Sequence, residues 1–520
     1  MGIPYYFSFL IKNNKNLLLL LENLNKNIHN FYLDCNSIIY DCVKNNPYKN
    51  DTSKVEYEWF IIKEVCNKID EYIFTIHPTQ NIFISFDGVA PLAKLNQQRN
   101  RRYLSQFEKK VTNNTQLWNQ TAITPGTEFM HKLSDFIIKY YKNNENKYNV
   151  QSIIISTSNE PGEGEHKLFD YIRKNENEHK DKTTIIYGID ADLIMLCLNH
   201  MHLCKNIYLY RETPFFIKSL DNSIEPNHCY ILNIHELAKD ILINMKTYSK
   251  YRIQDYIFIC FLLGNDFLPH FPSINIRNNG FYKLLNCYNS VFKNTHLSLT
   301  NGKKIYWNNL RKFIKIIADY EEHNLRNEYI QRDKLEKRQR ITDDTSIEDK
   351  YLTLPIHQRE IEKYINPFKE KWRERYYTSL FEFEPSSFYL NNACTNYLEG
   401  LEWTFKYYND DCYDWNWSYK YHYPPLLTDL IQYIPHFDTT MIEKQPKIPI
   451  HPYIQLSYVL PREHNELLPT NIREKLLSIE KYIYPEQLDI LWAFCNYFWQ
   501  CHLKLPTINI NQLKTILNIS

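Results

Sequence analysis

The stretch "NIFISFDGVAPLAKLNQQRNRRY", residues 81–103, combines an apolar run, an acid and a basic segment, and it is the starting point for predicting the fold class. It begins with an apolar run of strand length, which ends in the carboxylate of Asp87, and a segment rich in Lys, Gln and Arg follows. Three other runs share the strand character: "NIHNFYLD" (27–34), "QSIIIS" (151–156) and "TTIIYGID" (183–190). Continuous apolar strands that alternate with amphipathic helices are typical of a parallel sheet covered on both faces. The sequence therefore predicts an α/β fold.

The composition is that of a folded protein without a bulk charge signal. The chain has 520 residues, of which 43% are hydrophobic, so it can bury a large core. Lys and Arg total 61 and Asp and Glu total 60, so any basic surface for nucleic acid must be local. The 12 cysteines never form a C-x-x-C pair, and no apolar run has the length of a membrane span. We expect no membrane partner and a cytoplasmic location, in the host cell if the gene is viral.

Charge and aromatic content divide the chain into three expected parts. Residues 1–316 hold the predicted strands and form the expected α/β core. Residues 317–380 alternate densely in charge, which predicts long solvated helices projecting from the body. Residues 381–520 are rich in aromatic residues and are expected to pack against the core and complete its active-site pocket.

Seven acids stand at the ends of apolar runs or at predicted helix starts. They are Asp34, Asp87, Glu163, Glu165, Asp190, Asp192 and Asp266. Ligands of open α/β sheets bind beyond the carboxyl ends of the strands, so these acids are predicted to converge on one crevice. We expect Asp190 and Asp192 to point the same way in an extended segment, and Glu163 and Glu165 to flank Gly164 at a helix start.

Each acid also has a plain structural interpretation. Asp266 fits a helix cap, the acids of "PGEGEH" fit a helix N-terminus, and Asp34 fits a turn. Seven acids in apolar surroundings need counter-charge, however, and few Lys or Arg residues lie within these runs. An all-carboxylate set favours Mg²⁺ or Mn²⁺. Two such ions would clamp a phosphodiester, so the pattern predicts a nuclease with catalytic, metal-binding acids.

A basic helix is predicted directly behind Asp87, because Pro91 suits a first helical turn. Lys94, Gln98, Arg101 and Arg102 would then share one helix face, within an arc of roughly 100°. A solvated basic face is the common alternative. Because this face follows Asp87 directly, we interpret it as a pocket for a terminal phosphate next to the metals.

Motifs along nearly the whole chain resemble those of the XRN family of 5′→3′ exoribonucleases. In the first region they are "MGIPYYFSFL", "LDCNSIIY", "DGVAPLAKLNQQRNRRY", "EPGEGEHK", "YGIDADLIML" and "LLGNDFLPH". In the second they are "LEWTFKYY", "YDWNWSYKYHYPPL" and "LKLPTINI". The resemblance implies a core related to flap endonucleases and PIN-like nucleases, with a tower-like helical insertion between the two regions.

The resemblance also implies an activity and site roles. It implies Mg²⁺-dependent, processive removal of nucleoside 5′-monophosphates from single-stranded RNA with a 5′-monophosphate, as in mRNA decay. The seven family acids map onto the seven acids above, and the 5′-phosphate pocket maps onto Lys94, Gln98, Arg101 and Arg102. Tyr40, where the family usually has His, and either Trp415 or Trp417 would enclose a short stack of bases.

The chain ends soon after the second region, so we expect a short form without the long C-terminal domains of the large cytosolic members. No obligate protein partner is inferred. Two other functions share parts of the pattern. A structure-specific flap or DNA 5′-exonuclease would use the same acids, and a degenerate RNA-binding scaffold would be favoured only by loss of one or more of them. Core packing of Tyr40 and the two tryptophans also stays open.

Overall fold

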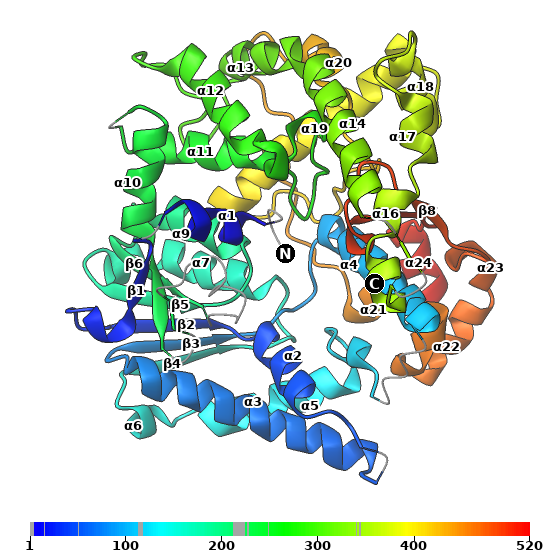
Figure 1. Ribbon diagram of the computed structural model, residues 1–520. Coiled ribbons are helices and arrows are strands. Elements are labelled where there is room, and N and C mark those ends of the chain that lie inside the picture. Colours follow the sequence, from blue (N-terminus) through cyan, green and yellow to red (C-terminus); the bar gives the residue numbers. More distant parts are fainter. Residues whose placement is uncertain are drawn as a thin grey trace.

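A seven-stranded, mainly parallel sheet forms the centre of the first half of the chain (Figure 1). The structure is a computed structural model and describes residues 5–14, 16–49, 51–112, 118–211, 224–225, 228–247, 249–339, 341–342 and 345–519. The strand order is β1-β7-β6-β5-β2-β3-β4. The strands are β1 (Leu18–Leu20), β2 (Asn30–Asp34), β3 (Asn81–Ser85), β4 (Ser152–Ser156), β5 (Thr183–Tyr187), β6 (Asn206–Tyr210) and β7 (Tyr230–Asn233).

The four predicted runs form the adjacent strands β2, β3, β4 and β5, and they pair in parallel as expected. The sequence reasoning did not find β1, β6 and β7. β1 pairs antiparallel with β7, and β7 pairs antiparallel with β6, so one edge departs from the parallel pattern. β1 covers only three residues, which is too short for a periodic signal to stand out. The predicted α/β class is confirmed.

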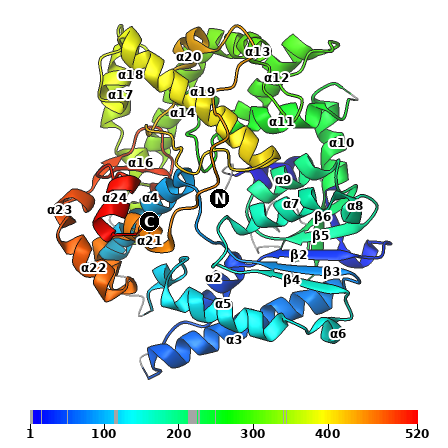
Figure 2. The same cartoon turned by 180° about the vertical axis from the view of Figure 1, so that it is seen from behind.

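Helices cover both faces of the sheet, and alternate strand residues enter different cores (Figure 2). Phe31, Leu33 and Ile84 pack against one layer of helices, while Tyr32 and Phe83 pack against the other. The first layer contains α2 (Asn36–Asn45), α3 (Lys54–Ile76), α5 (Glu128–Tyr141) and the short α6 (Glu145–Tyr148). The second layer contains α7 (Gly164–Lys174), α9 (Asp192–His200), α10 (Ile234–Asn244) and α11 (Arg252–Phe261), with α1 (Tyr6–Asn13) beside it and α8 (Glu176–His179) following α7.

Helix α4 (Leu92–Thr112) leaves the sheet and enters the C-terminal part of the chain (Figure 1). It lies beside α21 (Pro452–Val459). The Arg99 guanidinium donates to the carbonyls of Ile483 at 3.0 Å and Pro506 at 2.7 Å, and Asn100 donates to the Cys501 carbonyl at 3.1 Å. A helix that follows strand β3 closely in the sequence is therefore held by residues about 400 positions later.

The second half of the chain is mainly helical. Its further helices are α12 (Gly280–Phe292), α13 (Trp307–Asp319), α14 (Glu321–Arg338), α15 (Ile347–Leu352), α16 (Leu354–His357), α17 (Glu360–Ile365), α18 (Trp372–Leu380), α19 (Ser387–Asn409), α20 (Leu427–Tyr433), α22 (Thr470–Leu477), α23 (Glu480–Ile483) and α24 (Ile510–Leu517). A small antiparallel pair joins β8 (Asp489–Leu491) to β9 (His502–Lys504). The boundary expected at 316/317 falls inside α13. Among the described residues, no helix is long and apolar enough to cross a bilayer.

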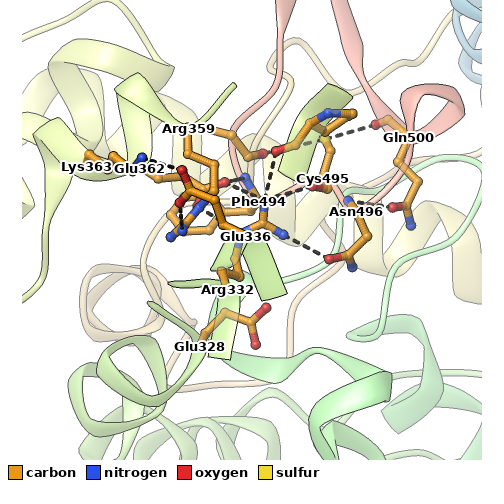
Figure 3. A network of polar contacts seen from close by, with 12 residues as sticks. Glu328, Arg332, Glu336, Arg359, Glu362, Lys363, Phe494, Cys495, Asn496 and Gln500 are labelled. Carbon is orange, nitrogen blue, oxygen red and sulfur yellow. Dashed lines mark hydrogen bonds and ion pairs between the residues drawn. The ribbon is translucent and has the colours of Figure 1, made fainter. Parts of the chain in front are cut away.

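The expectation that the charged segment 317–380 is solvated is wrong for its inner face (Figure 3). Arg332, Arg359 and Glu362 are 2%, 0% and 1% exposed. Arg332 binds the Glu362 carboxylate and donates to Asn496 Oδ1 at 2.9 Å and to the Cys495 carbonyl at 2.8 Å. Charge alternation alone cannot distinguish a solvated face from one whose opposite charges pair with each other and are then covered by another segment.

Candidate active site

The structure brings the seven predicted acids together at the carboxyl edge of the central strands; these seven residues are called the acid cluster below. Asp34 ends β2, Asp87 follows β3, and Glu163 and Glu165 stand at the start of α7 after β4. Asp190 follows β5, Asp192 begins α9, and Asp266 lies in the loop after α11. The helix start predicted at Gly164 is confirmed. The extended segment predicted for Asp190 and Asp192 is not, because α9 begins at Asp192.

Gly164 allows the close approach of two acids. A methyl group on its Cα would lie 2.4 Å from Asp34 Oδ1 and 3.4 Å from Asp87 Oδ1. Its N–H donates to Asp87 Oδ1 at 2.7 Å. A side chain at this position would therefore displace the Asp34 carboxylate, which is why the first position of α7 needs glycine.

Burial and mutual repulsion shape the charge of the cluster. Burial raises the pKa of Asp34 well above its usual range, and Asp87 and Asp190 raise it further. Burial, followed by the neighbouring Glu163, raises the pKa of Glu165. Burial and the charge of Asp266 raise the pKa of Asp192 to about 7. Carboxyl groups with such shifts lack sufficient positive charge around them and are typical of cation sites.

Lys94 lies among these acids, which sequence reasoning had not foreseen. Its ammonium group contacts Glu163 Oε2 and lies 2.7 Å from Asp266 Oδ2. Burial alone would lower the pKa of Lys94, but Asp266 and Glu163 raise it well above its usual range. Lys94 therefore stays charged and joins the basic helix to the acid cluster.

The other three residues of the predicted phosphate face lie further along α4. Arg101 is exposed, and Gln98 and Arg102 are half-buried. Gln98 Oε1 and Arg102 Nε are buried and make no hydrogen bond within the described part of the chain. Burial lowers the pKa of Arg102, whereas the nearby Tyr40 hydroxyl opposes that shift. Tyr40, on α2, is 43% exposed, so it lies near the phosphate face with part of its ring open to solvent.

Both candidate tryptophans of the second region are largely buried, at 4% exposed for Trp415 and 7% for Trp417. Trp417 stacks on Trp403, with ring centroids 5.3 Å apart and planes 25° apart, so one of its faces is already covered. The Trp415 carbonyl accepts a hydrogen bond of 2.9 Å from the Leu92 N–H at the start of α4. Stacking of bases on Tyr40 and on one of these two tryptophans stays a prediction.

Several residues that support the acids were not identified from the sequence. Asn36 donates to Asp87 Oδ2 at 2.6 Å and accepts from the Asp87 N–H at 3.0 Å. The Tyr407 hydroxyl donates to Glu163 Oε1 at 2.9 Å, and His166 stacks on the Tyr407 ring at 3.7 Å. Asn36 and Tyr407 lie within the quoted motifs "LDCNSIIY" and "LEWTFKYY", but only the fold shows which acid each one contacts.

The acid cluster fits an oxygen-liganded divalent cation. Asp34 Oδ1 and Asp192 Oδ1 are buried and accept no hydrogen bond from the described residues. Carboxylate oxygens are the ligands that Mg²⁺ and Mn²⁺ prefer. Among the described residues, no three acidic, His or Cys side chains already converge on a single ion position. The side chains are thus of the right kind but are not arranged as a closed coordination shell.

Comparisons with known families cover nearly the whole chain. The sequence model of the XRN 5'-3' exonuclease N-terminus matches residues 1–213, and that of the Xrn1 helical domain matches residues 248–366 and 355–518. The 5'-3' exoribonuclease 2 of Arabidopsis thaliana is 27% identical over 93% of this chain and 62% of its own length. The 5'-3' exoribonuclease 1 of Saccharomyces cerevisiae is also 27% identical, over 94% of this chain and 41% of its own length.

The 5'-3' exoribonuclease 1 of Homo sapiens is 28% identical over 99% of this chain and 34% of its own length. The chain therefore spans less than two thirds of the length of these relatives. Among solved structures, the catalytic core of Rad2 in complex with DNA substrate has a TM-score of 0.30 and 12% identity, over 55% of this chain and 68% of that chain.

Proposed function

This chain belongs to the XRN 5'-3' exonuclease family, and from that membership we propose that it is a 5′→3′ exoribonuclease. The proposed substrate is single-stranded RNA with a 5′-monophosphate, and the proposed products are nucleoside 5′-monophosphates, released processively. The observation that carries the proposal is the contact of Lys94, on the basic helix, with Glu163 and Asp266 of the acid cluster. An anion-binding face and a cation-binding cluster are thereby parts of one site.

The acid cluster would hold two divalent cations, Mg²⁺ or Mn²⁺, which when bound neutralise charge on the scissile phosphate and make a bound water more acidic. The chain's own residues keep the carboxylates in place. Asn36 and the Gly164 N–H orient Asp87, and the Tyr407 hydroxyl orients Glu163. Hydrogen bonds of this kind fix the direction in which a ligand oxygen points.

The basic face would select the end of the RNA. Arg101 and Arg102 offer guanidinium groups that suit a terminal phosphate, and the half-buried Gln98 lies on the same helix, α4. A triphosphate or a cap would place additional charge and bulk in a position built for one phosphate. Tyr40, close to Arg102, would stack on the first base without reading its identity.

The activity is tested with end-labelled RNAs that carry a 5′-monophosphate, a 5′-triphosphate or a 5′-hydroxyl, together with a single-stranded DNA of the same sequence. In Mg²⁺ we expect mononucleotides from the 5′-monophosphate RNA and slow decay of the others. Chelation of the metal should stop the reaction. Internal cleavage products, faster decay of the DNA, or RNA binding with no hydrolysis would contradict the proposal and point to the flap nuclease or the binding scaffold.

Arg101→Ala should reduce the preference for a 5′-monophosphate. A charge-assisted hydrogen bond contributes about 1.5–3 kcal/mol, so decay of the 5′-monophosphate RNA should slow by roughly 10-fold to 100-fold. Decay of the 5′-hydroxyl RNA should change little. Lys110→Ala is the control, because Lys110 is an exposed cation further along the same helix. Equal losses on both substrates would show that Arg101 does not read the end.

Tyr40→Ala should slow decay of the 5′-monophosphate RNA and shorten the processive run, whereas Tyr40→Phe should be nearly neutral. Stacking on an aromatic side chain contributes about 1–3 kcal/mol per base, and Phe retains the ring. Single-turnover decay and a melting curve are measured for each variant. A Tyr40→Ala protein that melts at a much lower temperature, yet degrades RNA at the normal rate while folded, would show that Tyr40 only packs.

A further inference from the structure

Four residues from three distant segments form an aromatic–arginine cluster at the surface: Tyr5, Arg277, Tyr497 and Trp499. The Arg277 guanidinium lies 3.7 Å from the centre of the Tyr5 ring and 4.9 Å from that of Tyr497. It also donates to the Tyr497 hydroxyl at 3.0 Å. The Tyr497 and Trp499 rings are parallel to within 6°, with centroids 6.0 Å apart, and Tyr5 lies 6.0 Å from Trp499.

The cluster is exposed more than packing alone requires. Trp499 is 40% exposed and Arg277 is exposed as well, while Tyr5 and Tyr497 are half-buried. Tryptophan has the largest apolar surface of any side chain and is usually well buried, so exposed rings beside a cation are typical of a binding surface. Tyr5 also has a left-handed backbone, with φ of 64°, which is uncommon for a bulky residue and concentrates at functional sites.

Two short connections link the cluster to both parts of the candidate site. On one side, Phe7, two residues after Tyr5, lies 4.1 Å below the Arg211 guanidinium, which donates to the Asp190 carbonyl at 3.2 Å. On the other side, Cys501, two residues after Trp499, accepts a hydrogen bond from Asn100, the neighbour of Arg101. One link therefore leads to the acid cluster and the other to the phosphate face.

We propose that the aromatic–arginine cluster is a second contact for single-stranded RNA, on which nucleotides downstream of the 5′ end stack while their phosphates approach Arg277. This inference rests on the proposed function, because it takes the strand held at the acid cluster to continue over this surface. Aromatic faces bind every base, and a guanidinium binds the backbone, so the contact needs no particular sequence. A processive enzyme needs such a grip beyond the nucleotide that it removes.

The test compares the binding of a short RNA with that of a long RNA. Binding of 5′-phosphorylated oligonucleotides, one three and one twelve nucleotides long, is measured by fluorescence anisotropy with the metal chelated. Trp499→Ala should weaken binding of the longer RNA by about fivefold or more. Binding of the shorter RNA should be unchanged, because it ends before it reaches the cluster. Trp499→Phe should retain most of the affinity, since a ring remains.

Tyr482→Ala is the matched control, because Tyr482 is 77% exposed in the same C-terminal part of the chain and lies outside the cluster. Unchanged binding of the longer RNA by Trp499→Ala, or equal weakening for both lengths, would overturn the second contact. The wild-type protein distinguishes this failure from failure of the proposed function. If the wild-type protein degrades 5′-monophosphate RNA while Trp499→Ala binds RNA normally, only the second contact is refuted. If the wild-type protein neither binds nor degrades RNA, the proposed exoribonuclease activity is refuted too.

Discussion

Replacing Asp190 by Asn should abolish RNA hydrolysis while RNA binding persists. Asp190 lies half-buried beyond β5, and its charge acts on both Asp34 and Glu165. The substitution keeps the shape of the side chain but removes a negative charge and a carboxylate, the group that Mg²⁺ prefers as a ligand. Bound cations supply several kcal/mol of transition-state stabilisation, so hydrolysis should fall by at least about 1000-fold. The phosphate face on α4 is untouched, which is why binding should remain.

Hydrolysis is measured as single-turnover decay of a 5′-monophosphate RNA in Mg²⁺. RNA binding is measured by fluorescence anisotropy with the metal chelated. Asp181→Asn is the control. Asp181 is an exposed acid just before β5, and it pairs with Lys205 at the surface. Near-normal turnover of Asp190→Asn would refute the assignment of the acid cluster as the catalytic centre. Loss of both hydrolysis and binding would show that the two functions are not separable.

Replacing Arg332 by Met should destabilise the protein more than any surface change on α14. Arg332 is 2% exposed and holds Glu362, Asn496 and the Cys495 carbonyl (Figure 3). Met fills similar volume but removes the donor that these three buried acceptors share. Removing one partner of a buried ion pair costs about 3–5 kcal/mol. Because Arg359 also binds Glu362, at 2.7 Å, the lower end of that range is expected, with a fall of several degrees in melting temperature.

Arg338→Met is the matched control, because Arg338 is an exposed arginine at the end of the same helix. Hydrogen exchange of residues 494–500 adds a local measurement, since Arg332 contacts this segment directly. We expect faster exchange there in Arg332→Met and no change in Arg338→Met. A melting temperature equal to that of the control would show that the buried network contributes little to stability.

Local patterns were sufficient for the parts of the fold that depend on neighbouring residues. The apolar runs predicted β2 to β5, Pro91 predicted the start of α4, and the glycine between two glutamates predicted the start of α7. The acids at the strand ends predicted their own convergence, because parallel strands end at a common edge. Antiparallel β1 and β7 did not follow from periodicity, since such short strands carry too few residues for a period to show. The helical start at Asp192 was not predicted either.

The tertiary structure alone decided which distant groups meet. Nothing in residues 81–103 shows that Lys94 contacts Asp266, that Tyr407 holds Glu163, or that Arg99 binds carbonyls near the C-terminus. The charged segment similarly buries Arg332 and Arg359 because both pair with its own Glu362 and because the chain at 494–496 bonds to Arg332 and Glu362. The sequence by itself determined the fold class, the acid cluster and the family. The tertiary structure decided the long-range contacts. A buried charge is stable only beside a partner of opposite charge or a hydrogen-bonding group, and the packing of whole elements determines which partner lies there.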